Sequence, residues 1–90
     1  MTYDEQVESG KELVRGMLAN LALEFHAPRL NDLTFKITDQ DFDYDRISLM
    51  DPQFKILAKI GRDDLADCPA DRGVRKRLEV QLRQAIGASH

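Results

Sequence analysis

Several features that stabilise or anchor other small proteins are scarce in this sequence of 90 residues. The single cysteine, Cys68, cannot form an internal disulfide and has no second thiol to share a cysteine metal site. Apolar runs extend over only a few residues, as at 21–23, whereas a membrane-spanning helix needs about 20. Acidic residues follow Met1 where a signal peptide would carry a basic region. A reducing, cytoplasmic location is therefore the simplest expectation.

The chain also lacks a strong charge of either sign. Its net charge of −3 argues against a chain-wide basic footprint for nucleic acid or an anionic membrane and leaves only local patches. Hydrophobic residues at 42% and charged residues at 32% are typical of a folded chain. Because independent cores need roughly 50 to 100 residues each, residues 1–90 are expected to form one domain.

The first segment with regular apolar spacing predicts an amphipathic helix from Thr2 to His26. Thr2 and Glu5 can form a capping box, although a repeat of the same pattern allows the firm helix to begin only after Gly10. Pro28 lacks an amide proton and disfavours helical backbone in the residue before it, so the helix is predicted to stop there.

A second helix is predicted to begin around Pro69, with Asp71 in its first turn and Gly87 as its C-terminal cap. Residues 63–67 are expected to form a loop or a short helical turn. The apolar face of this helix comprises Val74, Leu78, Leu82, Ala85 and Ile86.

Three segments between the helices, at 33–38, 44–50 and 54–60, are predicted to be strands because their apolar residues alternate with others. Pro52 suits the turn between the second and third. The side chains expected to face the core are Leu33, Phe35, Ile37, Ile47, Leu49, Phe54, Ile56, Ala58 and Ile60.

These elements predict an α+β fold of αβββα order. The economical packing lays both helices on one face of a three-stranded antiparallel sheet and leaves the other face open. Tyr44, Met50 and Leu57 are expected on that open face, together with several cations. The predicted interaction surface combines this face with the basic start of the second helix and comprises Lys36, Arg46, Lys55, Leu57, Lys59, Arg72, Arg75, Lys76 and Arg77.

No pattern in the sequence predicts catalytic, cofactor-binding or metal-binding residues, so the chain is not expected to be an enzyme. The acidic segment at 39–45 has half the spacing of a calcium loop, but Tyr44 occupies the glycine position and Met50 the glutamate position. It is therefore interpreted as an acidic connector. Of the two histidines, His26 ends a helix and His90 ends the chain, so neither indicates a site.

Two hypotheses of function follow. The first is a non-catalytic protein-interaction module that forms a homodimer, in which Leu23, Leu57 and Val80 lie off the predicted buried faces. The second is binding of RNA or DNA through the predicted basic surface. The αβββα order is shared with double-stranded-RNA-binding domains, small nucleoid-associated proteins and RNA-binding subunits of the signal recognition particle. The run at 75–77 is similar only in charge to the lysine cluster of the first of these.

Overall fold

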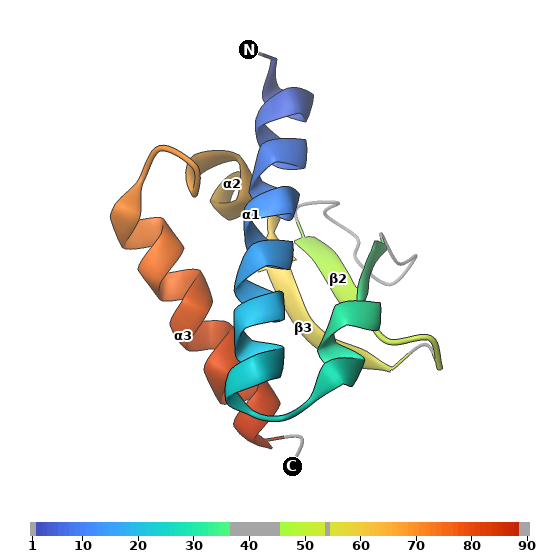
Figure 1. Ribbon diagram of the computed structural model, residues 1–90. Helices are drawn as coiled ribbons and strands as arrows, with labels where there is room; N and C mark the ends of the chain where they lie inside the picture. The colour runs from blue at the N-terminus through green and yellow to red at the C-terminus, as the bar shows by residue number, and fades with distance from the viewer. Residues whose placement is uncertain (1, 37–45, 54, 89–90) are drawn as a thin grey trace.

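A computed structural model describes residues 2–36, 46–53 and 55–88, and Figure 1 shows how they are arranged. The elements in chain order are α1 (Tyr3–Glu24), the 3-10 helix η1 (Pro28–Asp32), β1 (Thr34–Lys36), β2 (Arg46–Met50), β3 (Ile56–Gly61), α2 (Arg62–Asp67) and α3 (Arg72–Ala88). The strands form an antiparallel sheet in the order β1-β2-β3. An α+β fold is thus confirmed, while the predicted order omitted η1 and left open whether α2 is a loop or a helical turn.

The start of α1 follows the predicted cap. The Glu5 amide donates to the Thr2 hydroxyl oxygen at 3.3 Å, which satisfies one of the free amides of the first turn. The helix therefore begins before Gly10, and the alternative start after that glycine is wrong.

The end of α1 is closed by a residue with left-handed backbone. The amide of His26 donates to the carbonyl of Leu23 at 3.4 Å, and the amide of Ala27 donates to that of Ala22 at 2.8 Å. This pair of bonds is a Schellman motif, in which the residue after the cap adopts positive φ. His26 has φ of 53° and is the one non-glycine residue with positive φ in the described ranges. The chain then changes direction and continues into η1, which begins at Pro28.

The start of α3 is set by Asp71. Its carboxylate accepts the amide of Gly73 at 2.8 Å and the next amide at 3.3 Å, so the helix begins at Arg72. The predicted start at Pro69 is therefore early by three residues. Gly87 does not end the helix, which continues to Ala88.

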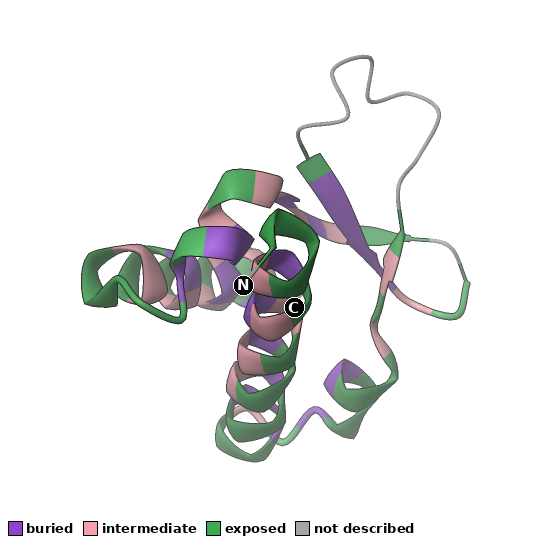
Figure 2. Cartoon of the chain, turned by 90° about the horizontal axis from the view of Figure 1, so that it is seen from above, coloured by how far each residue is buried: buried purple, intermediate pink, exposed green. Residues whose placement is uncertain are grey.

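One hydrophobic core joins the helices to the sheet. In Figure 2 the buried residues lie on the sides of the elements that face one another. The core cluster comprises Val7, Val14, Leu18, Leu21, Ala22, Ala27, Leu30, Ile47, Leu49, Ile60, Leu65, Ala66, Cys68, Leu78, Leu82 and Ile86. Helix α1 also reaches the sheet through Phe35, whose ring centre lies 5.9 Å from Lys11 Nζ and 5.6 Å from Arg15 Cζ.

Helices α1 and α2 pack in backbone contact. Gly10 is buried in α1, and a Cβ atom placed on it would lie 1.8 Å from the carbonyl oxygen of Leu65. The Cys68 thiol donates to the Leu65 carbonyl at 3.3 Å and lies 3.9 Å from the Gly10 carbonyl oxygen. A side chain at position 10 would keep the two helices apart, so the absence of one is what allows this approach.

The third strand departs from its predicted alternation. Leu49 is paired with Ala58 and Met50 with Ile56, so Leu57 has no partner across the β2–β3 ladder. This irregularity changes which side chains point inward and outward at the start of β3. Ile56, predicted inward, is 43% exposed, whereas Leu57, predicted outward, is half-buried against the core. The predicted inward residues Ile37 and Phe54 lie outside the described part of the chain.

The face of the sheet opposite the core was predicted to be open. Two of its positions are buried instead. Ser48 is fully buried and Met50 is 8% exposed, although both alternate with the core residue Leu49. Ser48 lies on one rung with Lys36 and Lys59, whose long side chains flank it. The prediction that Met50 is an exposed surface residue is therefore wrong. The Ser48 hydroxyl is buried and has no hydrogen-bond partner among the described residues.

Candidate functional site

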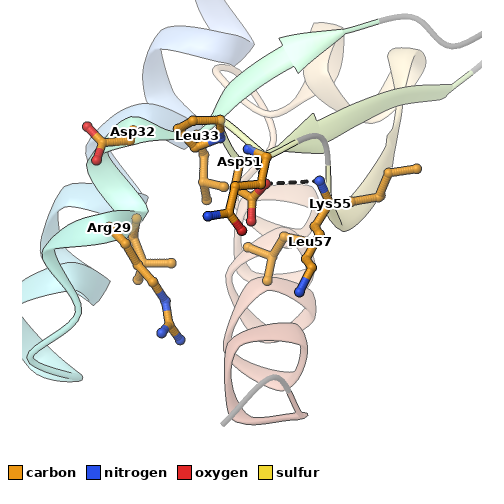
Figure 3. A pocket seen from close by; sticks show the side chains of 10 residues that line it. Arg29, Asp32, Leu33, Asp51, Lys55 and Leu57 are labelled. Atoms are coloured by element: carbon orange, nitrogen blue, oxygen red, sulfur yellow. Dashed lines mark hydrogen bonds between the residues drawn. The ribbon is translucent and has the colours of Figure 1, made fainter.

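A groove lies between η1 and the turn that joins β2 to β3, with a volume of about 580 Å³. Figure 3 shows the side chains that line it. We call it the hairpin groove; its residues are Arg29, Leu30, Asp32, Leu33, Asp51, Pro52, Gln53, Lys55, Ile56 and Leu57. Its size falls within the range of about 300 to 1,000 Å³ that is usual for ligand sites.

One wall of the hairpin groove is a turn held by Asp51. A single oxygen of this carboxylate accepts the amides of Gln53 and Lys55, each at 2.9 Å. The amide of Asp51 in turn donates to the carbonyl of Lys55 at 3.0 Å. These bonds tie Gln53 and Lys55 to Asp51, and the two amide dipoles stabilise its carboxylate.

The floor of the hairpin groove is apolar. Leu30 is buried, Leu33 and Leu57 are half-buried against the core, and Ile56 is 43% exposed. These side chains come from η1, from the residue before β1 and from β3, so the floor spans elements that are distant in sequence. An apolar floor with a few polar groups around it is the usual composition of a binding site.

Two cations stand beside this floor. In Figure 3 the side chains of Arg29 and Lys55 extend toward the same end of the groove with Leu57 between them, while Asp32 lies at the opposite end. Neither cation makes a side-chain hydrogen bond or an ion pair within the described structure. The groove is therefore polarised, with a basic end whose charges are uncompensated.

A second hollow of about 480 Å³ lies where α2 and α3 meet β3. It is lined by Arg46, Lys59, Gly61, Asp63, Asp64 and Gln81. The Tyr3 hydroxyl donates to Asp63 at 2.6 Å, and Arg77 forms an ion pair with Asp64. The Gln81 amide group donates to the Lys59 carbonyl at 2.9 Å. These bonds join α1 and α3 to α2 and α3 to β3, and they give Asp63, Asp64 and Gln81 a structural role.

The structure does not bring the predicted interaction surface together. Lys36, Arg46 and Lys59 lie on the outward side of the sheet, and Lys55 and Leu57 belong to the hairpin groove. The remaining residues, Arg72, Arg75, Lys76 and Arg77, lie in the first turns of α3.

Two of the four predicted cations in α3 are already engaged. Arg75 donates to the carbonyls of Cys68 at 3.1 Å and Pro69 at 3.3 Å, and Arg77 is paired with Asp64. Both cations lie near the start of α3, where the positive end of the helix dipole disfavours them, and these bonds compensate for that position. They leave Arg72 and Lys76 as the exposed cations of this segment without a bond among the described residues.

The Cys68 thiol is fully buried, and this burial raises its pKa, an effect that the nearby Arg75 cation partly opposes. A high pKa keeps the sulfur protonated and disfavours a nucleophilic role. Among residues 2–36, 46–53 and 55–88, no group of three histidine, cysteine, aspartate or glutamate side chains could hold a metal ion. Within the same ranges, no helix combines the length and apolar character required to cross a bilayer.

Sequence reasoning missed the η1 side of the hairpin groove. Arg29, Leu30 and Asp32 were not assigned to any element, because a single 3-10 turn has no apolar period to detect. The one local signal was Pro28, which favours the first position of such a turn.

Comparisons of the chain with protein-family models, with curated proteins and with solved structures gave no match. Function therefore has to be inferred from the chain's own residues.

Proposed function

We propose that this chain is a non-catalytic protein-interaction domain that forms a homodimer through the surface of its two long helices. The observation that carries the proposal is the exposure of large apolar side chains on α1 and α3. Leu23 is 77% exposed and Val80 is 45% exposed. Single exposed apolar residues are common on protein surfaces, so their placement has to be considered as well.

An ion pair joins the two helices beside these residues. Arg83 contacts Glu24 at 2.7 Å, and it also pairs with Glu79 on its own helix at 3.2 Å. Glu24 follows Leu23 directly, and Val80 lies one turn before Arg83. We call Leu23, Glu24, Glu79, Val80 and Arg83 the helix patch.

The helix patch has the composition of a self-complementary surface. A two-fold axis brings the same patch of two copies together, so the apolar side chains of one copy meet those of the other, and Arg83 of each copy faces carboxylates of the other. A chain of 90 residues buries only about two thirds of its unfolded surface, so a second copy adds burial that the monomer lacks. The support for a homodimer is thus two exposed apolar side chains with an ion-paired arginine and two carboxylates beside them.

Sedimentation velocity over a range of protein concentrations, from roughly 5 to 200 µM, tests this proposal, because a dimer dissociates on dilution. We expect a concentration-dependent dimer for the natural chain and a monomer for Leu23→Asp. Ile56→Asp is the matched control, because Ile56 is also an exposed aliphatic residue but lies in the hairpin groove. A natural chain that remains monomeric at the highest concentration, or a control that dissociates as fully as Leu23→Asp, would contradict the proposal.

Two parts of the proposal extend the sequence predictions. A cytoplasmic location suits the free, buried thiol of Cys68. Packing of α1 and α3 on one face of the sheet is supported by their shared core cluster with Ile47, Leu49 and Ile60.

Nucleic-acid binding stays an alternative prediction with less support, because the predicted cations are dispersed. A salt-sensitive mobility shift with RNA or DNA would favour it.

A further inference from the structure

The hairpin groove lies outside the helix patch and has the features of a separate binding site. Its floor is formed by Leu30, Leu33, Ile56 and Leu57, which together offer an apolar surface for one inserted side chain. On the wall at Asp51, three hydrogen bonds join this residue to Gln53 and Lys55.

The charges of the groove define the ligand further. Arg29 from η1 and Lys55 from the opposite wall extend toward one end, where no described acid pairs with either of them (Figure 3). One oxygen of the Asp51 carboxylate accepts two amides of its own turn. Asp32 lies at the far end in the same view. A ligand that places negative charge beside its apolar group therefore complements the basic end, whereas a basic ligand does not.

We propose that the hairpin groove binds an extended acidic peptide segment that inserts one aliphatic side chain between Arg29 and Lys55. The two cations come from opposite walls, so a segment with a carboxylate on each side of its apolar residue meets both. The inserted side chain contacts Ile56 and Leu57 on the floor. This site is additional to the proposed dimer and uses a different surface of the domain.

Fluorescence anisotropy with a labelled peptide tests the inference. The probe is the heptapeptide Gly-Ser-Asp-Leu-Asp-Ser-Gly, and the comparison peptide has asparagine in place of both aspartates. We expect saturable binding of the acidic probe, weakened by raising the salt concentration from about 50 to about 500 mM, and much weaker binding of the asparagine peptide. Equal binding of the two peptides, or no binding of the acidic probe at a protein concentration of about 1 mM, would overturn the inference.

Variants of the protein locate the site. Arg29→Gln and Lys55→Gln should each weaken binding by about two- to fivefold, as expected for the loss of one exposed ion pair. Ile56→Ser should weaken it as well. Arg72→Gln is the matched control, because Arg72 is an exposed cation outside the groove and its removal changes the net charge equally. If the control weakens binding as much as Arg29→Gln, the attraction is non-specific and the inference fails.

Two further measurements distinguish peptide binding in the hairpin groove from dimer formation and from fatty-acid binding. Leu23→Asp should bind the probe with unchanged affinity, since the helix patch is not part of the groove; retained binding by a monomeric variant therefore distinguishes failure of the dimer from failure of this site. Laurate, which joins an apolar chain to a single carboxylate, should bind more weakly than the peptide. Binding of laurate with no binding of the peptide would show a small-molecule site and refute the peptide assignment.

Discussion

Replacing Gly10 by alanine is the most direct test of the packing between α1 and α2. The added Cβ would lie 1.8 Å from the Leu65 carbonyl oxygen, 2.5 Å from its carbonyl carbon and 2.9 Å from its Cα. Comfortable contact between carbon atoms begins at about 3.5 Å, so the helices would have to separate by more than about 1 Å. The obstacle is backbone, which cannot rotate away as a side chain can.

The expected loss of stability follows from two opposed effects. Overpacking of a core costs about 1 to 3 kcal/mol, and an obstacle made of backbone belongs at the upper end of that range. Alanine returns about 1 kcal/mol through its higher helix propensity. We therefore expect Gly10→Ala to lower the free energy of unfolding by about 2 kcal/mol or more.

Urea unfolding followed by far-UV circular dichroism measures this change, with every variant at the same protein concentration. Gly16→Ala is the matched control, because Gly16 lies in the same helix, is exposed and would place its Cβ with no atom within 4 Å. The control should gain about 0.5 to 1 kcal/mol. The reasoning is refuted if both substitutions stabilise the chain, since that result would mean the helices do not meet at Gly10.

Three further predictions use the same assay. His26→Gly should stabilise the chain by about 1 kcal/mol, because glycine adopts the observed φ of 53° without strain; a destabilised variant would show that the imidazole contributes more than the backbone costs. Ser48→Ala should be neutral or stabilising by up to about 1 kcal/mol, because it removes a buried hydroxyl that has no partner in the described part of the chain, and a loss above about 1 kcal/mol would count against this. Burial raises the pKa of the Cys68 thiol above its unfolded value of about 8.5, so the folded chain holds the thiol proton more tightly than the unfolded chain. The stability that the protonated thiol contributes should therefore be complete below about pH 8.5 and decline as pH rises further. Cys68→Ala should show a smaller decline between about pH 8 and pH 10, and parallel declines would exclude the thiol as its cause.

The sequence predicted the elements in which apolar residues recur at a regular spacing. The apolar spacing in α3 identified buried residues such as Leu78 and Leu82, because the residues on one buried face of a helix recur every three to four positions. The alternation in β2 likewise placed Ile47 and Leu49 in the core. In these elements the local pattern and the tertiary packing agree.

Features that leave no regular apolar spacing in the sequence were missed. The irregularity that exposes Ile56 and buries Leu57 depends on how β3 pairs with β2, and no pattern within one strand encodes it. The hairpin groove combines η1 with a turn that is distant in the chain, so its shape depends on the tertiary fold. Lys55 and Leu57 were predicted as surface residues, but Arg29, which lines the same groove, was not.

The contact between Gly10 and α2 also has a consequence for biosynthesis. The Cys68 thiol that lies near the Gly10 carbonyl is 58 positions further along the chain. At about 5 to 20 residues per second, the ribosome releases α1 several seconds before its packing partners α2 and α3 emerge. During that interval α1 can pack only on η1 and the strands, and the part of its apolar stripe that contacts α2 and α3 stays uncovered. Native packing of the nascent chain therefore has to wait for its last third, and a stalled chain ending before α2 would present this stripe to chaperones.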